Sequence, residues 1–254
     1  MTQYFVIIAD SELELIPEGI HDERSVQTNA RTRGKHPGKI LLDASHHHPA
    51  FGKLPESERR GRPDIVHFCL LLCLDSNLSA EGNLKVFVHT RNDDVIAVKP
   101  ETRLPPHYIR FIGLIESLYE QRVVPSRENP LLELRQGVTL EALVNALKPD
   151  QVLVLEQDGA EVSPGEVLVD PKAERVVVIV GGFSKGRFKS DIRKLDPKVI
   201  SFGKRQMKAW TAVSRLLCSI ECSSEGAAAP DADVEPVKPP KPAKPRRAPR
   251  KKAA

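Results

Sequence analysis

The stretch VIVGGFSKGRF, residues 178–188, decides the fold. It overlaps the apolar run RVVVIV (175–180), which is typical of a strand buried on both faces of a parallel sheet. The run ends at Gly181 and Gly182, and Gly186 follows in the next loop. Ligands of parallel α/β sheets bind beyond the carboxyl ends of the strands, where glycine lets the backbone approach them closely. The spacing is not G-x-G-x-x-G, so a dinucleotide-binding fold is disfavoured.

The segments on either side predict an α/β domain with a layered sheet. Upstream, strands are expected at 3–9, 39–42, 84–89, 94–98 and 151–156, and helices at 62–74, 108–121 and 138–147. Downstream, a strand is expected at 198–202 and a final helix at 210–221. The polar turn 90–93 lies between two of the strands and indicates a hairpin.

Composition favours a globular protein outside the membrane. The chain has 254 residues, of which 40% are hydrophobic and 28% charged. Its apolar runs are all shorter than the roughly 18 residues that span a bilayer. The start, MTQYFVIIAD, leads into a strand without the basic region of a signal peptide. We therefore expect a cytoplasmic protein with no membrane partner.

The net charge of +4 is unevenly distributed. Eight Lys and Arg and no acidic residues follow from Lys238 onward, which leaves 30 basic and 34 acidic residues in the rest. The folded body is therefore net negative, and any RNA-binding charge on it must be local. Residues 226–254 are rich in Ala, Pro, Lys and Arg and are expected to be a disordered tail. The tail either contacts phosphate non-specifically or only aids solubility.

Cysteine and histidine spacing does not predict a metal site. Cys69 and Cys73, like Cys218 and Cys222, are four residues apart, which is helical spacing and not the C-x-x-C of a zinc ribbon. We expect reduced thiols on apolar helix faces. The run His46 to His48 is the other candidate, but adjacent side chains in a loop diverge. No metal is expected.

The segment RRGRPD (59–64) places three arginines just before a helix. Backbone N–H groups at a helix N-terminus favour anions, so phosphate is the natural ligand of Arg59, Arg60 and Arg62. Asp64 lies two residues after Arg62 and could orient its guanidinium through a charge-assisted pair. The alternative is an ordinary surface cluster of arginines.

A second arginine segment is ETRLPPHYIRF (101–111). Arg103 precedes the Pro-Pro turn, and Arg110 lies on the first turns of the next helix. His107 and Tyr108 offer ring faces on which a base could stack. Alternatively, Tyr108 packs in the core and both arginines are merely solvated. The residues alone leave these two interpretations open.

From Met1 to about Glu225 the sequence resembles the small-subunit ribosomal RNA pseudouridine N1-methyltransferases, which belong to the knotted SPOUT superfamily. The resemblance is carried by LLDASHHHPA (41–50), RRGRPDIVH (59–67), ETRLPPHYIRF (101–111), IVGGF (179–183) and AWTAVSR (209–215). The pairing of RRGRPD with a TRLP-x-x-Y-x-RF segment some forty residues later is specific to this branch. The lack of an extension before the first strand resembles archaeal members.

The resemblance implies one SPOUT-type domain over residues 1–225, with a deep trefoil knot at the C-terminal end of its sheet. It implies S-adenosyl-L-methionine as the cofactor, held by the knot loops, and a homodimer whose interface forms part of the site. The implied function is methylation of N1 of a pseudouridine in small-subunit ribosomal RNA during ribosome biogenesis.

Individual residues can be carried over by the same resemblance. Arg62, Arg103 and Arg110 match the family's RNA-binding arginines, and Asp64 matches the residue that steadies the first of them. Pro106 stands where the family has a further arginine, so one phosphate contact is expected to be missing or supplied elsewhere. The cofactor is expected, mostly through backbone groups, at Gly181, Gly182, Gly186, Val199, Ile200, Ser201, Phe202, Gly203 and Lys204.

The chemistry is in-line methyl transfer from a sulfonium to a ring nitrogen, for which alignment is the main requirement. The N1–H of pseudouridine is weakly acidic, so no strong base is needed and no general base is assigned. One rival function keeps the fold but methylates another uridine atom or a ribose 2′-hydroxyl. Another is a ribosome-assembly factor whose RNA binding matters more than catalysis.

Overall fold

Strand β7 (Arg175–Gly181) is the buried strand that the opening stretch predicts. The computed structural model describes residues 2–162 and 169–224. In it β7 lies between β1 (Gln3–Ser11) and β6 (Gln151–Glu161) and runs parallel to both. Its side chains from Val176 to Ile179 are fully buried. The run of β-branched residues thus forms a strand that is covered on both faces.

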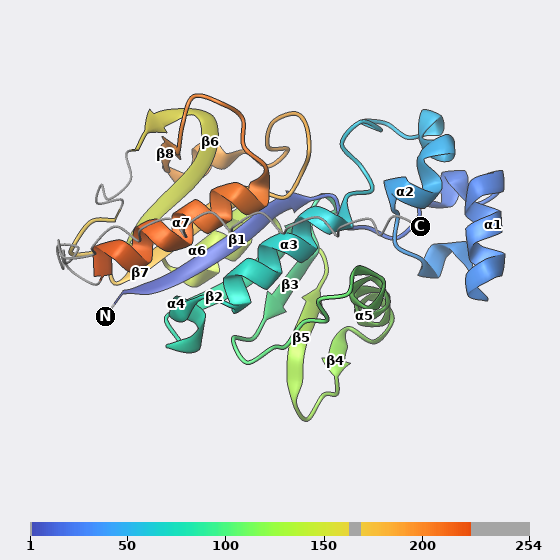
Figure 1. Cartoon of the computed structure of the whole chain (residues 1–254), viewed down its shortest axis with the longest axis horizontal. Coiled ribbons are helices and arrows are strands. Elements are labelled where there is room, and N and C mark those ends of the chain that lie inside the picture. The colour runs from blue at the N-terminus through green and yellow to red at the C-terminus, as the bar shows by residue number, and fades with distance from the viewer. Residues whose placement is uncertain (1, 163–168, 225–254) are drawn as a thin grey trace, which may run out of the picture.

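The sheet has eight strands in the order β4-β5-β3-β2-β1-β7-β6-β8 (Figure 1). The half from β2 to β8 is parallel, and the half from β2 to β4 is antiparallel. The sheet is therefore mixed rather than wholly parallel. The remaining strands are β2 (Leu84–Thr90), β3 (Val95–Val98), β4 (Val123–Pro125), β5 (Pro130–Arg135) and β8 (Lys198–Ser201).

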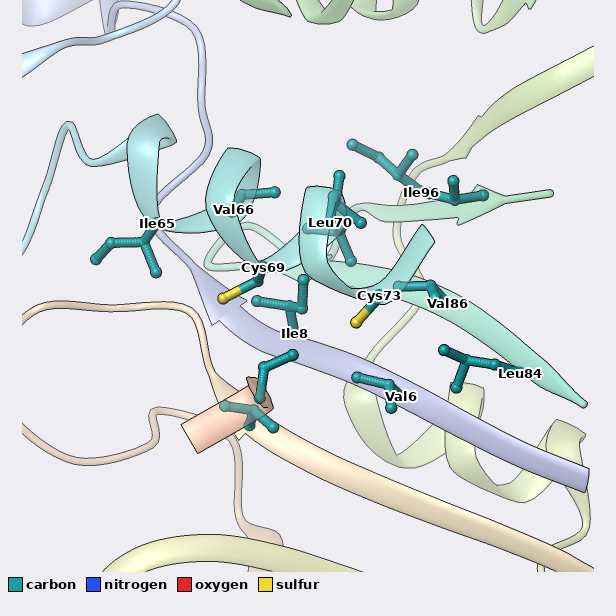
Figure 2. Close-up of a cluster of buried hydrophobic side chains, with 14 of the residues drawn as sticks. Val6, Ile8, Ile65, Val66, Cys69, Leu70, Cys73, Leu84, Val86 and Ile96 are labelled. Carbon is teal, nitrogen blue, oxygen red and sulfur yellow. The ribbon is translucent and has the colours of Figure 1, made fainter. Parts of the chain in front are cut away.

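Helices cover both faces of the sheet. On one face, α3 (Pro63–Leu74) packs beside α7 (Ala209–Ser224), with α5 (Tyr108–Gln121) next to it over the antiparallel half (Figure 1). Figure 2 shows Val66, Cys69, Leu70 and Cys73 of α3 directed towards the apolar side chains of β1 and β2. On the other face, α6 (Leu140–Leu147) covers the second apolar cluster, which includes Ile7 and Ile179.

A small helical lobe is inserted between β1 and α3, at the right of Figure 1. It contains α1 (Arg24–Arg33), α2 (Ala44–His47), η1 (Glu18–Ile20), η2 (Pro37–Lys39) and η3 (His48–Lys53). The strand predicted at 39–42 is wrong. Pro37 and Gly38 form a 3-10 turn there, and only an isolated bridge between Leu41 and Leu15 follows. The lobe has its own core, which includes Ile20, Val26 and Phe51.

The other predicted strands and helices are confirmed to within a few residues, except that β6 continues to Glu161, beyond the predicted end at 156. Strands β4 and β5 and helix α1 were not predicted. The prediction of core thiols holds for Cys69 and Cys73 but is wrong for Cys218 and Cys222, which are exposed on α7. None of the helices in the described ranges is long and apolar enough to cross a membrane. The predicted tail, 226–254, lies outside the described residues.

Candidate functional site

A cavity of about 260 Å³ lies beside the carboxyl ends of β7 and β8 and beside residues 155–158 of β6, where the pairing of β6 with β7 ends. This is the end of a parallel sheet at which the sequence predicted a ligand site. Its walls come from four segments: Leu155, Glu156, Gln157 and Asp158; Val180, Gly181, Phe183, Gly186, Arg187 and Phe188; Ile200, Ser201 and Phe202; and Arg205, Gln206, Met207, Ala209 and Ala212. We refer to it below as the cofactor cavity, because the sequence predicts the cofactor here.

The residues predicted to bind the cofactor divide into two groups. Gly181, Gly186, Ile200, Ser201 and Phe202 line the cavity. Gly182, Val199, Gly203 and Lys204 are not among its lining residues in the described part of the chain. The first stretch of the wall, 155–158, was not predicted. The signal for it was available, because β6 is a parallel neighbour of β7 and its carboxyl end must reach the same edge.

Gly182 is required by packing against β1. A Cβ atom at this position would lie 2.8 Å from the Cα of Ser11. The Gly182 amide donates to the Ala9 carbonyl at 2.7 Å, and its carbonyl accepts from the Glu12 amide at 3.2 Å. The close approach that glycine permits here is therefore between two strand ends.

The loop that follows β8 and forms part of the cavity wall is held by hydrogen bonds from two side chains. The Ser201 hydroxyl donates to the Gly203 carbonyl at 2.8 Å, and Nη1 of Arg215 donates to the Phe202 carbonyl at 2.7 Å. Gly203 has a φ of +151°, a conformation that glycine adopts readily. Arg215 was not predicted as a site residue, yet it ties α7 to the wall of the cavity.

Two of the three predicted phosphate-binding arginines are buried in ion pairs. Nε of Arg59 donates to Glu12 at 2.5 Å, and Nε and Nη2 of Arg60 donate to Glu14 at 2.8 and 2.7 Å. These two arginine side chains are only 6% and 7% exposed. The prediction that they bind phosphate is therefore wrong, because the acidic residues after β1 already neutralise them.

Arg62 is the arginine of this segment that reaches solvent. Its Nε and Nη2 donate to the two carboxylate oxygens of Asp64 at 2.8 and 2.7 Å. The fork predicted from their spacing is thus formed, with about 30% of each side chain exposed. The hydrogen bonds to Asp64 raise the pKa of Arg62, and the guanidinium is a permanent cation.

Arg62 also lines a second hollow, of about 120 Å³, next to the cofactor cavity. The two hollows share four wall residues: Phe183, Gln206, Met207 and Ala209. Lys208 and Trp210 complete the second hollow on the side of α7. The structure therefore brings the first arginine segment to the cofactor cavity.

The second arginine segment lies against α3. Arg103, Pro106 and Arg110 are all exposed. Tyr108 is half-buried, and its hydroxyl donates to Asp43 at 2.7 Å. Burial raises the pKa of this phenol, as does its hydrogen bond to Asp43. Tyr108 therefore packs within the fold, as one of the two interpretations held, while both arginines remain accessible.

The histidine run does not form a cluster. His47 is fully buried, and its Nδ1 accepts from the Asp43 amide at 3.0 Å. His46 and His48 are exposed. Within residues 2–162 and 169–224 there is no group of His, Cys, Asp and Glu side chains arranged to hold a metal ion.

The chain matches a known protein family over most of its length. Residues 6–221 match the family described as EMG1/NEP1 methyltransferase. The chain belongs to the EMG1/NEP1 methyltransferase family. A ribosomal RNA small subunit methyltransferase Nep1 from Pyrococcus furiosus is 48% identical to this EMG1/NEP1 chain over 219 residues, covering 85% of the chain and 95% of that protein. One from Methanothrix thermoacetophila is 40% identical over 225 residues, covering 89% and 98%.

A solved structure extends the EMG1/NEP1 match to the fold. The crystal structure of Archaeoglobus fulgidus Nep1 bound to S-adenosylhomocysteine superposes with a TM-score of 0.78 at 40% sequence identity. The match covers 89% of the present chain and all of that chain. The eight-stranded mixed sheet is therefore the fold of an EMG1/NEP1 protein.

Proposed function

We propose that this EMG1/NEP1 protein uses S-adenosyl-L-methionine to methylate N1 of a pseudouridine in small-subunit ribosomal RNA. The observation that carries the proposal is the common wall of the cofactor cavity and the hollow beside Arg62. A nucleotide held at Arg62 would lie next to the cofactor. Family membership and the names of the relatives support methylation of small-subunit ribosomal RNA, and the pseudouridine target rests on the family resemblance.

The residues of the cofactor cavity suit an adenosyl ligand. Leu155, Ile200 and Phe202 supply apolar walls, as small-molecule sites generally require. Gly181 and Gly186 expose backbone groups at the turn between strand and loop. Bound S-adenosylmethionine supplies an electrophilic methyl group. The assignment of Gly182, Val199, Gly203 and Lys204 to this site remains a prediction from the family resemblance.

The protein's contribution to the reaction is alignment. Holding two reactants in the attacking geometry removes several kcal/mol of the barrier. Arg62, fixed by Asp64, is placed to hold a phosphate of the target nucleotide beside the cavity, and Arg103 and Arg110 extend the contact to neighbouring phosphates. Because the N1–H of pseudouridine is weakly acidic, none of these residues needs to act as a base.

Pro106 is uncharged and stands at the position where the family has a further arginine. Its position between Arg103 and Arg110, on the exposed side of the turn, leaves these two cations to carry this part of the contact. We therefore expect fewer phosphate contacts along this segment than the family resemblance alone implies.

The dimer and the trefoil knot are part of the proposal. The apolar residues Val213, Leu216 and Ile220 of the final helix are buried within the protomer, so they are not available for a dimer interface. The exposed large hydrophobic side chains among the described residues are Phe68 and Leu72 on α3, which are 50% and 36% exposed, and Ile109 on α5, which is 70% exposed. Light scattering should report a dimer at micromolar concentration, and a monomer would contradict this part of the proposal.

Methylation can be tested on a short stem-loop of small-subunit rRNA sequence that contains either pseudouridine or uridine. Nucleoside mass spectrometry should find one methyl group on the base of pseudouridine and none on the uridine control. Methylated ribose or methylated uridine would instead support the rival methyltransferase functions. Loss of the same nucleoside from cellular rRNA when the protein is removed identifies the physiological target.

The assembly-factor alternative requires a variant that binds RNA but cannot bind cofactor. Ala212 lines the cofactor cavity from α7 and does not line the hollow beside Arg62, so Ala212→Phe should fill the cavity. Calorimetry should show lost binding of S-adenosylhomocysteine, and anisotropy should show retained binding of the stem-loop. If such a variant supports growth fully, assembly is the dominant role.

A further inference from the structure

Arg59 contacts the loop 183–187, which forms one wall of the cofactor cavity, on the side away from the cavity. Its guanidinium carbon lies 4.4 Å from the centre of the Phe183 ring, within the range of a cation–π contact. Its Nη1 donates to the carbonyl oxygen of Arg187 at 3.0 Å. A Cβ atom on Gly186 would lie 3.5 Å from the same nitrogen. Phe183, Gly186 and Arg187 all line the cavity, whereas Arg59 is not among its lining residues.

Arg59 is itself fixed by a buried carboxylate. Glu12 is fully buried and accepts from Nε of Arg59 through one oxygen and from Nη1 of Arg91 through the other. Glu12 follows β1 directly, so its position is set by the centre of the sheet. The contacts form a continuous chain from the sheet, through Glu12 and Arg59, to the loop 183–187.

Stability alone does not account for this arrangement. Nη2 of Arg59 is buried and has no hydrogen-bond partner among the described residues. A buried donor without a partner costs free energy, and a buried ion pair often contributes little net stability. Departures of this kind are expected where a group serves a site.

We propose that Arg59 is a positioning residue of the cofactor site. It holds the loop 183–187 in the conformation that forms one wall of the cavity, without touching the cofactor. It also lies three residues before Arg62 in the same segment, so one short stretch of chain supports both the cofactor wall and the RNA contact. The inference rests on the proposed cofactor site.

Arg60 provides a matched control for Arg59. It lies in the same segment, is 7% exposed and is also paired with a buried glutamate, Glu14, through two hydrogen bonds. Its further hydrogen bond goes to the Pro55 carbonyl, in the lobe and away from the cavity. Loss of either guanidinium should therefore lower the free energy of unfolding to a similar extent, but only one of them supports the loop.

The test compares Arg59→Met, Arg59→Lys and Arg60→Met in the full-length protein. Calorimetry should give a Kd for S-adenosylhomocysteine raised at least about tenfold in both Arg59 variants, as for loss of a hydrogen bond from a charged group. Lysine keeps the charge beside Glu12 but lacks the planar fork that reaches the Arg187 carbonyl. Arg59→Lys should therefore recover stability without recovering cofactor affinity.

Kinetics supply a second measurement. The KM for S-adenosylmethionine should rise in Arg59→Lys, with kcat retained at saturating cofactor. Arg60→Met should keep the wild-type Kd despite its lower stability. An unchanged Kd in Arg59→Lys, or an equal rise in Arg60→Met, would overturn the inference and leave the proposed function intact. A wild-type protein that does not bind S-adenosylhomocysteine would instead contradict the cofactor site itself.

Discussion

Nε2 of His67 lies 2.8 Å from the carbonyl oxygen of Pro105, and the His67 ring stacks on Phe111 with centroids 4.3 Å apart. Because a carbonyl only accepts, the imidazole donates this hydrogen bond. Burial lowers the pKa of His67, although the bond to Pro105 opposes the shift. The contact connects the helix that begins beside Arg62 to the turn between the other two predicted RNA-binding arginines.

Replacing His67 with phenylalanine should separate this hydrogen bond from the ring stacking. His67→Phe keeps an aromatic ring against Phe111 but leaves the Pro105 carbonyl without its donor, so stability should fall by about 1 kcal/mol. Stem-loop affinity, measured by fluorescence anisotropy, should fall by roughly three- to tenfold because the turn is less well held. The exposed His107→Phe serves as the control and should change neither quantity.

Asp64→Asn should weaken RNA binding even though it removes a negative charge. The fork on Arg62 loses its ionic partner, and the expected loss is roughly 1–3 kcal/mol of binding free energy. The exposed Glu101→Gln removes one charge near the other arginine segment and should leave binding equal or slightly tighter. If Asp64→Asn, like Glu101→Gln, left binding equal or slightly tighter, Asp64 would act only by repelling phosphate.

Gly182→Ala should act on folding before it acts on the cofactor. The added methyl group would meet the backbone of Ser11 at the end of β1, and overpacking of this kind costs roughly 1–3 kcal/mol. Urea denaturation should show the loss, while Gly52→Ala, which has open space for a Cβ, should not. Lost cofactor affinity with unchanged stability would place Gly182 at the ligand instead.

His47 should make stability depend on pH. Burial lowers its pKa from 6.5 to about 4, so the unfolded chain binds a proton more readily than the folded one. Stability is then complete above pH 6.5 and falls as the pH drops towards 4, by at most about 3 kcal/mol. Urea denaturation at pH 7.5 and 5 should show this decline in the wild type and in the exposed His46→Gln. In His47→Gln the decline should be smaller.

The parallel half of the fold was predictable from sequence because its strands are apolar runs without proline. The run at 175–180 and its neighbours were placed correctly. Strand β4 has only three residues, and Pro125 and Pro130 lie within β4 and β5, so local patterns opposed a strand there. Their existence depends on pairing with β3, which is a tertiary effect that no local pattern reports.

The site was predictable where chemistry depends on local spacing. The fork between Arg62 and Asp64 follows from two residues that are two positions apart at the start of α3. The burial of Arg59 could not be predicted in this way, because its partner Glu12 lies 47 residues away in the chain. The alternation of acidic residues after position 9 was the available signal, since isolated charges are rarely buried unless paired.

The place of β1 at the centre of the sheet has a consequence for synthesis on the ribosome. Gln3 pairs with Arg175, so one edge of β1 has no partner until residues far later in the chain are translated. At roughly 5–20 residues per second the delay is on the order of 10–30 s. Until then an apolar strand edge is open to pairing with other nascent chains, and it is a natural binding site for chaperones. Ribosome-bound chains that stop short of β7 should therefore aggregate unless chaperones are present.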